Sequence, residues 1–307
     1  MADQAGIAPP MGLARALLAG ARPQQWTKNL LVLAALVFAG RFTDAAFVVP
    51  SLLAFVVFCA ASSAVYLLND VCDAERDRKH PLKRMRAVAS GALPARVALV
   101  ASGLLATAAV AGGFLLRAPF GLTVVAYVGL QLAYSLALKR VVILDVLCVA
   151  AGFVLRADAG AVVLGVEFST WLMICAGLLA LFLALAKRRY ELLEVANAAA
   201  HRRSLAHYSP QMLDQMIAVV TASTLMAYTL YTFDDATVAK FGTDNLKWTI
   251  PFVLYGIFRY LYLVYSQHEG GRPSRHLLTD KPLLLAVLLY AAVSAWIVFH
   301  TPMGGRP

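Results

Sequence analysis

Nine long apolar stretches divide the chain, and most reach the roughly 20 residues that a helix needs to cross a bilayer. Only 14% of the residues are charged, against about 25% in an ordinary soluble domain. A spanning backbone must satisfy its own hydrogen bonds, so the sequence predicts an all-α, polytopic membrane protein. We expect one integral membrane domain over residues 1–307, a bundle of nine transmembrane helices. The expected spans are about 24–41, 47–68, 94–116, 119–138, 141–163, 168–186, 211–233, 248–266 and 282–300.

The basic residues predict an orientation for these spans. With the N-terminus in the cytoplasm, 20 of the 27 Lys and Arg fall on the cytoplasmic side, five fall outside, and Arg156 and Arg259 fall within spans. That asymmetry is the usual topology signal of a plasma (inner) membrane protein, and it leaves the C-terminus outside. Three cytoplasmic loops, 69–93, 187–210 and 267–281, are long and charged. The basic bias follows from topology and anionic lipid, so we expect no nucleic-acid partner.

Acidic residues interrupt the bases at the end of the second span, in "NDVCDAERDRKHPLKRMR" at 69–86. On a helix, Asn69, Asp73 and Asp77 are four residues apart and line one face. Oxygen side chains in that arrangement suit Mg²⁺, which completes its coordination with waters and substrate phosphates. No Cys or His pattern competes for a softer metal. A solvated helix end with Asp–Arg pairs is the structural alternative.

The bases that follow, including Lys83 and Arg84, have two interpretations. They bind phosphate oxygens that the metal leaves uncovered, or they mark the cytoplasmic side.

The acidic stretch Asn69–Asp77 resembles the NDxxDxxxD signature of the UbiA superfamily of intramembrane prenyltransferases. Further stretches resemble one branch of it, the decaprenyl-phosphate phosphoribosyltransferases of mycobacteria and relatives: "RPQQWTKN", "YSLALKRVVILDV", "KRRYELLE" and "LLTDKPL". The resemblance implies nine transmembrane helices, an active site facing the cytoplasm and capped by the three loops, and Asp73 and Asp77 as catalytic metal ligands. It also implies phosphoribosyl diphosphate (PRPP) as soluble donor, decaprenyl phosphate as lipid acceptor, and a product used for cell-wall arabinogalactan.

The loop after the sixth span departs from the usual family pattern of a second Asp-rich motif. It reads Lys187-Arg188-Arg189-Tyr190-Glu191, with no Asp. We expect no second full magnesium cluster there. The bases suit the second anionic group of PRPP, its 5-phosphate, so we assign Lys187, Arg188, Tyr190 and Glu191 to substrate binding. Topology marking explains the bases equally, and Tyr190 is also a candidate interfacial aromatic.

Other charged residues at span ends complete the expected site. Lys28, Lys139 and Arg140 are candidates for binding donor or lipid phosphate, with snorkelling as the alternative. Asp70 is a candidate further ligand, or orients a bound water. Asp280 has no role we can derive beyond capping the last span.

These residues together predict a Mg²⁺-dependent pentosyltransferase that moves 5-phosphoribose from PRPP to decaprenyl phosphate and releases diphosphate. An aromatic prenyltransferase with a polyprenyl diphosphate donor is the alternative, with the lipid diphosphate on the metal. A transporter would need broken helices or a polar path at the midplane. The sequence leaves open the polyprenol length and the oligomeric state, a homo-oligomer included.

Overall fold

The computed structural model describes residues 12–38, 41, 43–79, 83–167, 169–194, 203–266 and 279–300. Parts of all three expected cytoplasmic loops, including His80 and His201, lie outside this set. The secondary structure of the described residues is entirely helical. The chain forms two compact units, Met1–Lys139 with Gly152–Glu167 and Arg140–Ala151 with Phe168–Pro307. We call them unit 1 and unit 2.

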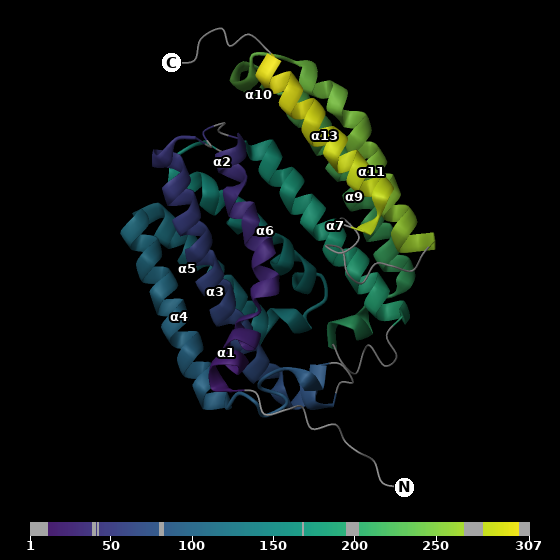
Figure 1. Ribbon diagram of the computed structural model, residues 1–307. Coiled ribbons are helices and arrows are strands. Elements are labelled where there is room, and N and C mark those ends of the chain that lie inside the picture. The colour runs from purple at the N-terminus through teal and green to yellow at the C-terminus, as the bar shows by residue number, and fades with distance from the viewer. Residues whose placement is uncertain are drawn as a thin grey trace. The chain divides into compact units, whose positions relative to one another are not determined.

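Unit 1 is built around α3, a helix of 34 residues. Asp44 caps its start by accepting from the Ala46 N–H (2.9 Å). Pro50 lies inside the helix, in its second turn, where it removes one backbone hydrogen bond. Figure 1 shows α3, α4 and α5 side by side. The elements of unit 1 are α1 (Leu13–Ala21), the 3₁₀ segment η1 (Pro23–Leu33), α2 (Ala34–Phe38), α3 (Ala45–Arg78), η2 (Lys83–Met85), α4 (Ala95–Leu116), α5 (Ala118–Leu136) and the second half of α6 (Leu144–Leu164).

Unit 2 holds the first half of α6 and the C-terminal helices. Ser209 caps α9 by accepting from the Met212 N–H (3.1 Å), and Pro210 opens that helix. The pairs α7 with α9 and α11 with α13 pack against each other. The further elements are α7 (Thr170–Glu194), η4 (Arg203–His207), α9 (Pro210–Phe233), α10 (Asp235–Phe241), η5 (Asn245–Thr249), α11 (Ile250–Ser266) and α13 (Lys281–His300); η3 (Leu138–Arg140) spans the junction.

Each unit has an apolar core and many exposed apolar side chains. Phe58, Phe120 and Tyr127 are buried in unit 1, and Phe182 and Leu213 in unit 2. Large apolar side chains also cover the outer faces of the helices; Leu115 is 87% exposed and Leu104 68%. Such faces fit lipid, and seven of the described helices are long and apolar enough to cross a membrane. The chain is therefore a polytopic membrane protein.

Two of the nine expected spans differ from the prediction. The stretch 24–41 is not a continuous α-helix, because η1 is followed by only five residues of α2. Its polar residues explain the interruption, since Asn29 is buried in side-chain hydrogen bonds to α3 instead of facing lipid. The stretch 248–266 contains α11, which is 17 residues long and lies at the short end of the spanning range.

Candidate functional site: the acidic end of α3

The candidate site is built on the C-terminal part of α3. At 1.5 Å per residue, its 34 residues extend about 51 Å, well beyond a hydrocarbon core of about 30 Å. The excess length carries the acidic motif past the apolar region. At 100° per residue, Asn69, Asp70, Asp73 and Asp77 fall within an arc of about 100° on this helix. The predicted stripe of oxygen side chains is thus continuous and helical.

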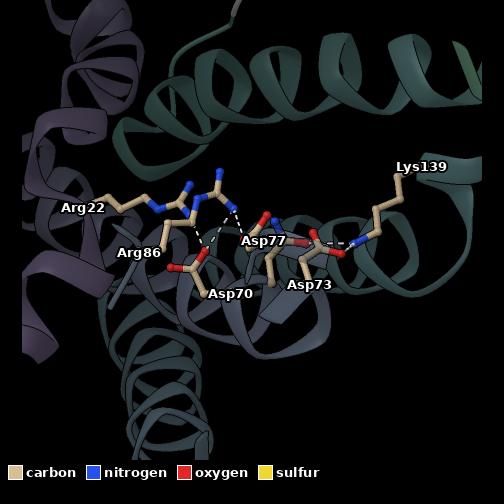
Figure 2. A network of polar contacts seen from close by, with 7 residues as sticks. Arg22, Asp70, Asp73, Asp77, Arg86 and Lys139 are labelled. Atoms are coloured by element: carbon tan, nitrogen blue, oxygen red, sulfur yellow. Dashed lines mark hydrogen bonds and ion pairs between the residues drawn. The ribbon is translucent and has the colours of Figure 1, made fainter. Parts of the chain in front are cut away.

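Asp70 and Asp77 share one arginine. The Arg86 guanidinium lies 2.6 Å from Asp77 Oδ2 and 3.4 Å from Asp70 Oδ1. Arg22 also donates to Asp70 Oδ1. Both acids are buried, with 2% of Asp70 and 4% of Asp77 exposed, so these cations balance charges that would otherwise be costly to bury. Figure 2 shows the guanidinium groups of Arg22 and Arg86 converging on Asp70.

Asn69 and Asp73 share a lysine. Lys139 Nζ donates to Asn69 Oδ1 (3.1 Å) and to Asp73 Oδ1 (2.8 Å). Figure 2 shows Lys139 approaching Asp73 from the side opposite to Arg22. Lys139 follows the end of α5, so α3 and α5 together place it. The predicted metal ligands Asn69, Asp73 and Asp77 thus have different basic partners, since Lys139 binds the first two and Arg86 binds Asp77.

The donor set suits a hard divalent cation. Three carboxylates and one amide oxygen occupy the stripe, and neither Cys nor His contributes. Within the described ranges, no group of three His, Cys, Asp or Glu side chains already converges as a preformed metal site. Figure 2 shows that side-chain cations are paired with the carboxylates of Asp70, Asp73 and Asp77.

The other predicted bases of unit 1 lie on the 3₁₀ segments η1 and η2. Lys28 is on η1 with an exposed side chain, and Lys83 and Arg84 are on η2, which follows the acidic motif along the chain. Arg84 is exposed as well, and Lys83 is half-buried.

In unit 2, the predicted base Arg188 belongs to a buried network around Asp145. Asp145 is fully buried and accepts from Arg188 Nε (3.0 Å), Ser204 Oγ (3.0 Å) and Tyr208 Oη (2.8 Å). Burial and the bond to Asp145 raise the pKa of Tyr208 to about 12. Arg188 also donates to Glu191 Oε2 (2.6 Å). This network ties the segment after α7 to the start of α6.

The remaining predicted residues of unit 2 have less contact with this network. Lys187 Nζ lies 3.9 Å from Glu191 Oε1. Tyr190 is half-buried on α7, and Arg140 is exposed on η3. Asp280 accepts from the Leu283 N–H (2.9 Å) at the start of α13 and binds Arg259, which confirms the predicted cap.

Sequence reasoning missed the role of Arg22 and the pairing of Asp145. Arg22 is 48 residues from Asp70, and it occupies a left-handed conformation (φ 54°) between α1 and η1. Its position just before Pro23 was the available signal, because a proline opens a new segment there. Asp145 pairs with Arg188, which is 43 residues away on another helix, and no local pattern in the sequence indicates that contact.

The fold agrees with comparisons to known proteins. The family model for the UbiA prenyltransferase family matches residues 28–279, so the chain belongs to that family. Decaprenyl-phosphate phosphoribosyltransferase of Corynebacterium glutamicum is 37% identical over 96% of this chain and 90% of its own length. The protein of that name from Mycobacterium tuberculosis H37Rv is 33% identical over 97% of this chain and all of its own length.

Solved structures support the same fold. A UbiA homologue from Archaeoglobus fulgidus, bound to GPP and Mg²⁺, superposes with a TM-score of 0.71 at 18% identity, covering 92% of this chain and 99% of its own. A digeranylgeranylglyceryl phosphate synthase superposes with a TM-score of 0.64 at 13% identity, covering 94% and 97%.

Proposed function

We propose that the protein transfers the 5-phosphoribosyl group of PRPP to decaprenyl phosphate and releases diphosphate. The observation that carries this proposal is the similarity of 33–37%, over nearly the whole chain, to proteins named decaprenyl-phosphate phosphoribosyltransferase. The acidic stripe of α3 supports it independently, since it offers the oxygen ligands that a metal-bound diphosphate needs. The product would serve as a precursor of cell-wall arabinogalactan.

We assign the metal ligands to the stripe. Asn69, Asp73 and Asp77 would hold Mg²⁺, and Asp70 would be a further ligand or orient a water. When bound, the metal neutralises charge on the departing diphosphate. Lys139 lies 2.8 Å from Asp73 and Arg86 2.6 Å from Asp77, so both cations are within reach of an anion at these acids. Each can turn from its carboxylate to a phosphate oxygen when the donor arrives.

The chemistry needs positioning more than proton transfer. The acceptor phosphate is an anion at neutral pH, so it attacks without a general base. The ribosyl carbon develops oxocarbenium character as the bond to diphosphate breaks, as in other glycosyl transfers. A carboxylate of the stripe near the sugar would stabilise that cation. A single displacement inverts the sugar carbon and gives a β-linked product.

The remaining candidate residues are assigned to substrate binding. In unit 1 these are Lys28, Lys83, Arg84 and Lys139, and in unit 2 Arg140, Lys187 and Arg188 with Tyr190 and Glu191. Arg188 is 4% exposed and paired with Asp145 and Glu191, so its contribution would be to hold the segment around Tyr190 in place.

We also propose nine membrane crossings in the plasma membrane, with the N-terminus and the acidic stripe on the cytoplasmic side. The distribution of Lys and Arg supports this orientation. It gives the soluble donor direct access to the stripe, while the lipid acceptor enters from the bilayer.

Aromatic prenyl transfer is the rival function, because the family name and the solved homologue bound to GPP both point to prenyl diphosphates. It is less well supported, since residues 187–194 lack an Asp-rich motif and Glu191 is bound to Arg188.

Diphosphate release separates the two functions. Purified protein with Mg²⁺ and PRPP should release diphosphate only after decaprenyl phosphate is added. Release from a polyprenyl diphosphate with an aromatic acid, and none from PRPP, would make the rival function correct.

A further inference from the structure

The 3₁₀ segment η1 is unusually long and unusually well held. Such segments rarely exceed three or four residues, and longer ones mark strain or function; η1 has 11. At its centre, Asn29 is fully buried and donates to Ser62 Oγ (3.0 Å) and to Cys59 Sγ (3.4 Å) on α3. Its amide oxygen accepts from Arg156 Nε (2.9 Å) on α6. Asn29 therefore connects η1 to two helices at once.

Arg156 is a buried cation that has no acidic partner among the described residues. Only 5% of it is exposed, and it donates to Tyr127 Oη (2.6 Å) and to the Gly152 carbonyl (2.8 Å) besides Asn29. Its guanidinium carbon also lies 4.8 Å from the centre of the Tyr127 ring. No carboxylate pairs with it among the residues that the structure describes. A charge in such a place is costly, so its retention within a membrane helix indicates a role in function.

A second contact fixes the same face of α6 to η1. A Cβ placed on Gly160 would lie 2.0 Å from the Val32 carbonyl oxygen, so the two backbones meet where only glycine fits. Arg156 and Gly160 are one helical turn apart, and they hold Asn29 and Val32, which are three residues apart on η1. These two contacts form a clamp on the C-terminal half of η1.

The N-terminal end of η1 lies at the acidic stripe. Arg22 pairs with Asp70, and its guanidinium carbon lies 5.3 Å from the centre of the Tyr66 ring. Trp26 Nε1 donates to Ser63 Oγ (3.0 Å), which holds the segment along α3. From Ser62 to Asp70 is eight residues of α3, or about 12 Å. Along α3 the clamp is therefore about two helical turns from the stripe, and η1 connects Asn29 in the clamp with Arg22 at the stripe.

We infer that Arg156 is a positioning residue: through Asn29 it fixes η1 so that Arg22 reaches Asp70 in the stripe that binds the donor diphosphate. The inference rests on the proposed function of that stripe. An arginine suits the task because its planar fork meets three acceptors in one fixed geometry, which neither lysine nor glutamine reproduces. Loss of the fork releases η1, moves Arg22 and weakens donor binding.

Cys59 is a native reporter for the clamp, because its thiol is buried behind Asn29 while Cys72 is exposed. In full-length Cys72→Ser protein in detergent, N-ethylmaleimide labelling of Cys59 is followed by mass spectrometry. Arg156→Gln should label about tenfold faster than the parent, and its KM for PRPP should rise about tenfold with a smaller change in kcat. Arg117→Gln is the matched control; Arg117 donates to the Val162 carbonyl of α6 (2.9 Å) without touching η1, so neither quantity should change.

If Arg156→Gln does not fold, Arg156→Lys and the double variant Arg156→Lys with Asn29→Asp test the same contact. Arg156→Lys alone should label faster, and the added carboxylate should restore protection of Cys59 by pairing with the lysine. Unchanged labelling in Arg156→Gln and in Arg156→Lys would overturn the inference whatever the substrate, because labelling requires no turnover. Faster labelling with an unchanged KM for the diphosphate donor would overturn the positioning role. Failure of PRPP itself as a donor would instead contradict the proposed function.

Discussion

Replacing Asp145 with alanine should strongly destabilise unit 2. Its carboxylate is fully buried and holds Arg188, Ser204 and Tyr208 at 2.8–3.0 Å. The variant leaves the buried Arg188 cation with Glu191 as its remaining acidic partner in this network. It also strips the Tyr208 hydroxyl of its acceptor.

The expected magnitude follows from the burial. Removing one partner of a buried, hydrogen-bonded ion pair costs about 3–5 kcal/mol, whereas breaking an exposed pair costs at most about 1 kcal/mol. At roughly 2–3 °C per kcal/mol for a chain of this size, Asp145→Ala should lower the unfolding midpoint by about 6–15 °C. Asp214→Ala is the control. Asp214 also pairs with an arginine, Arg189, but its side chain is 38% exposed, so the shift should be small.

Thermal unfolding of the purified variants in one detergent, followed by tryptophan fluorescence, measures the difference. An isosteric apolar replacement of both partners, Asp145→Leu with Arg188→Met, should recover most of the loss, because no unpaired charge is then buried. Equal midpoints for Asp145→Ala and Asp214→Ala would refute the reasoning that burial decides the cost.

Two further predictions use the same unfolding assay. Gly160→Ala should lower the midpoint by several degrees, because its Cβ would fall 2.0 Å from the Val32 carbonyl oxygen, whereas Gly103→Ala, with open space around its Cβ, should leave it unchanged or higher. Tyr208 ionises near pH 10 when unfolded but near 12 when folded, so its contribution is present below pH 10 and lost as the pH rises toward 12. Wild-type protein should therefore lose more stability than Tyr208→Phe between pH 10 and 12, and equal losses would contradict that assignment.

The sequence predicted the parts of the site that depend on local periodicity. Asn69, Asp70, Asp73 and Asp77 lie on one helical arc, and the cap at Asp280 is present, because both follow from spacing along one element. Membership of the UbiA family followed from the same acidic motif and is confirmed by the family model.

What the sequence did not predict depends on distant contacts. Arg22 reaches Asp70 across 48 residues and Lys139 reaches Asp73 across 66, and neither pairing leaves a local pattern. The prediction of a continuous α-helix over 24–41 was wrong for the same reason. Hydropathy only lowers the score of the span at Asn29. In the structure Asn29 is buried and its hydrogen bonds to α3 and α6 hold η1 in place as a 3₁₀ segment.

Transfer of label from PRPP into the lipid phase tests the central claim most directly. Purified protein would be incubated with Mg²⁺, decaprenyl phosphate and PRPP labelled in the ribose, beside Asp73→Ala and a sample with excess chelator. We predict label in the extracted lipid with wild-type protein, and a loss of at least about a hundredfold in both comparisons, equivalent to about 2.7 kcal/mol. Absence of label in the lipid with folded wild-type protein, or full transfer by Asp73→Ala, would contradict the account.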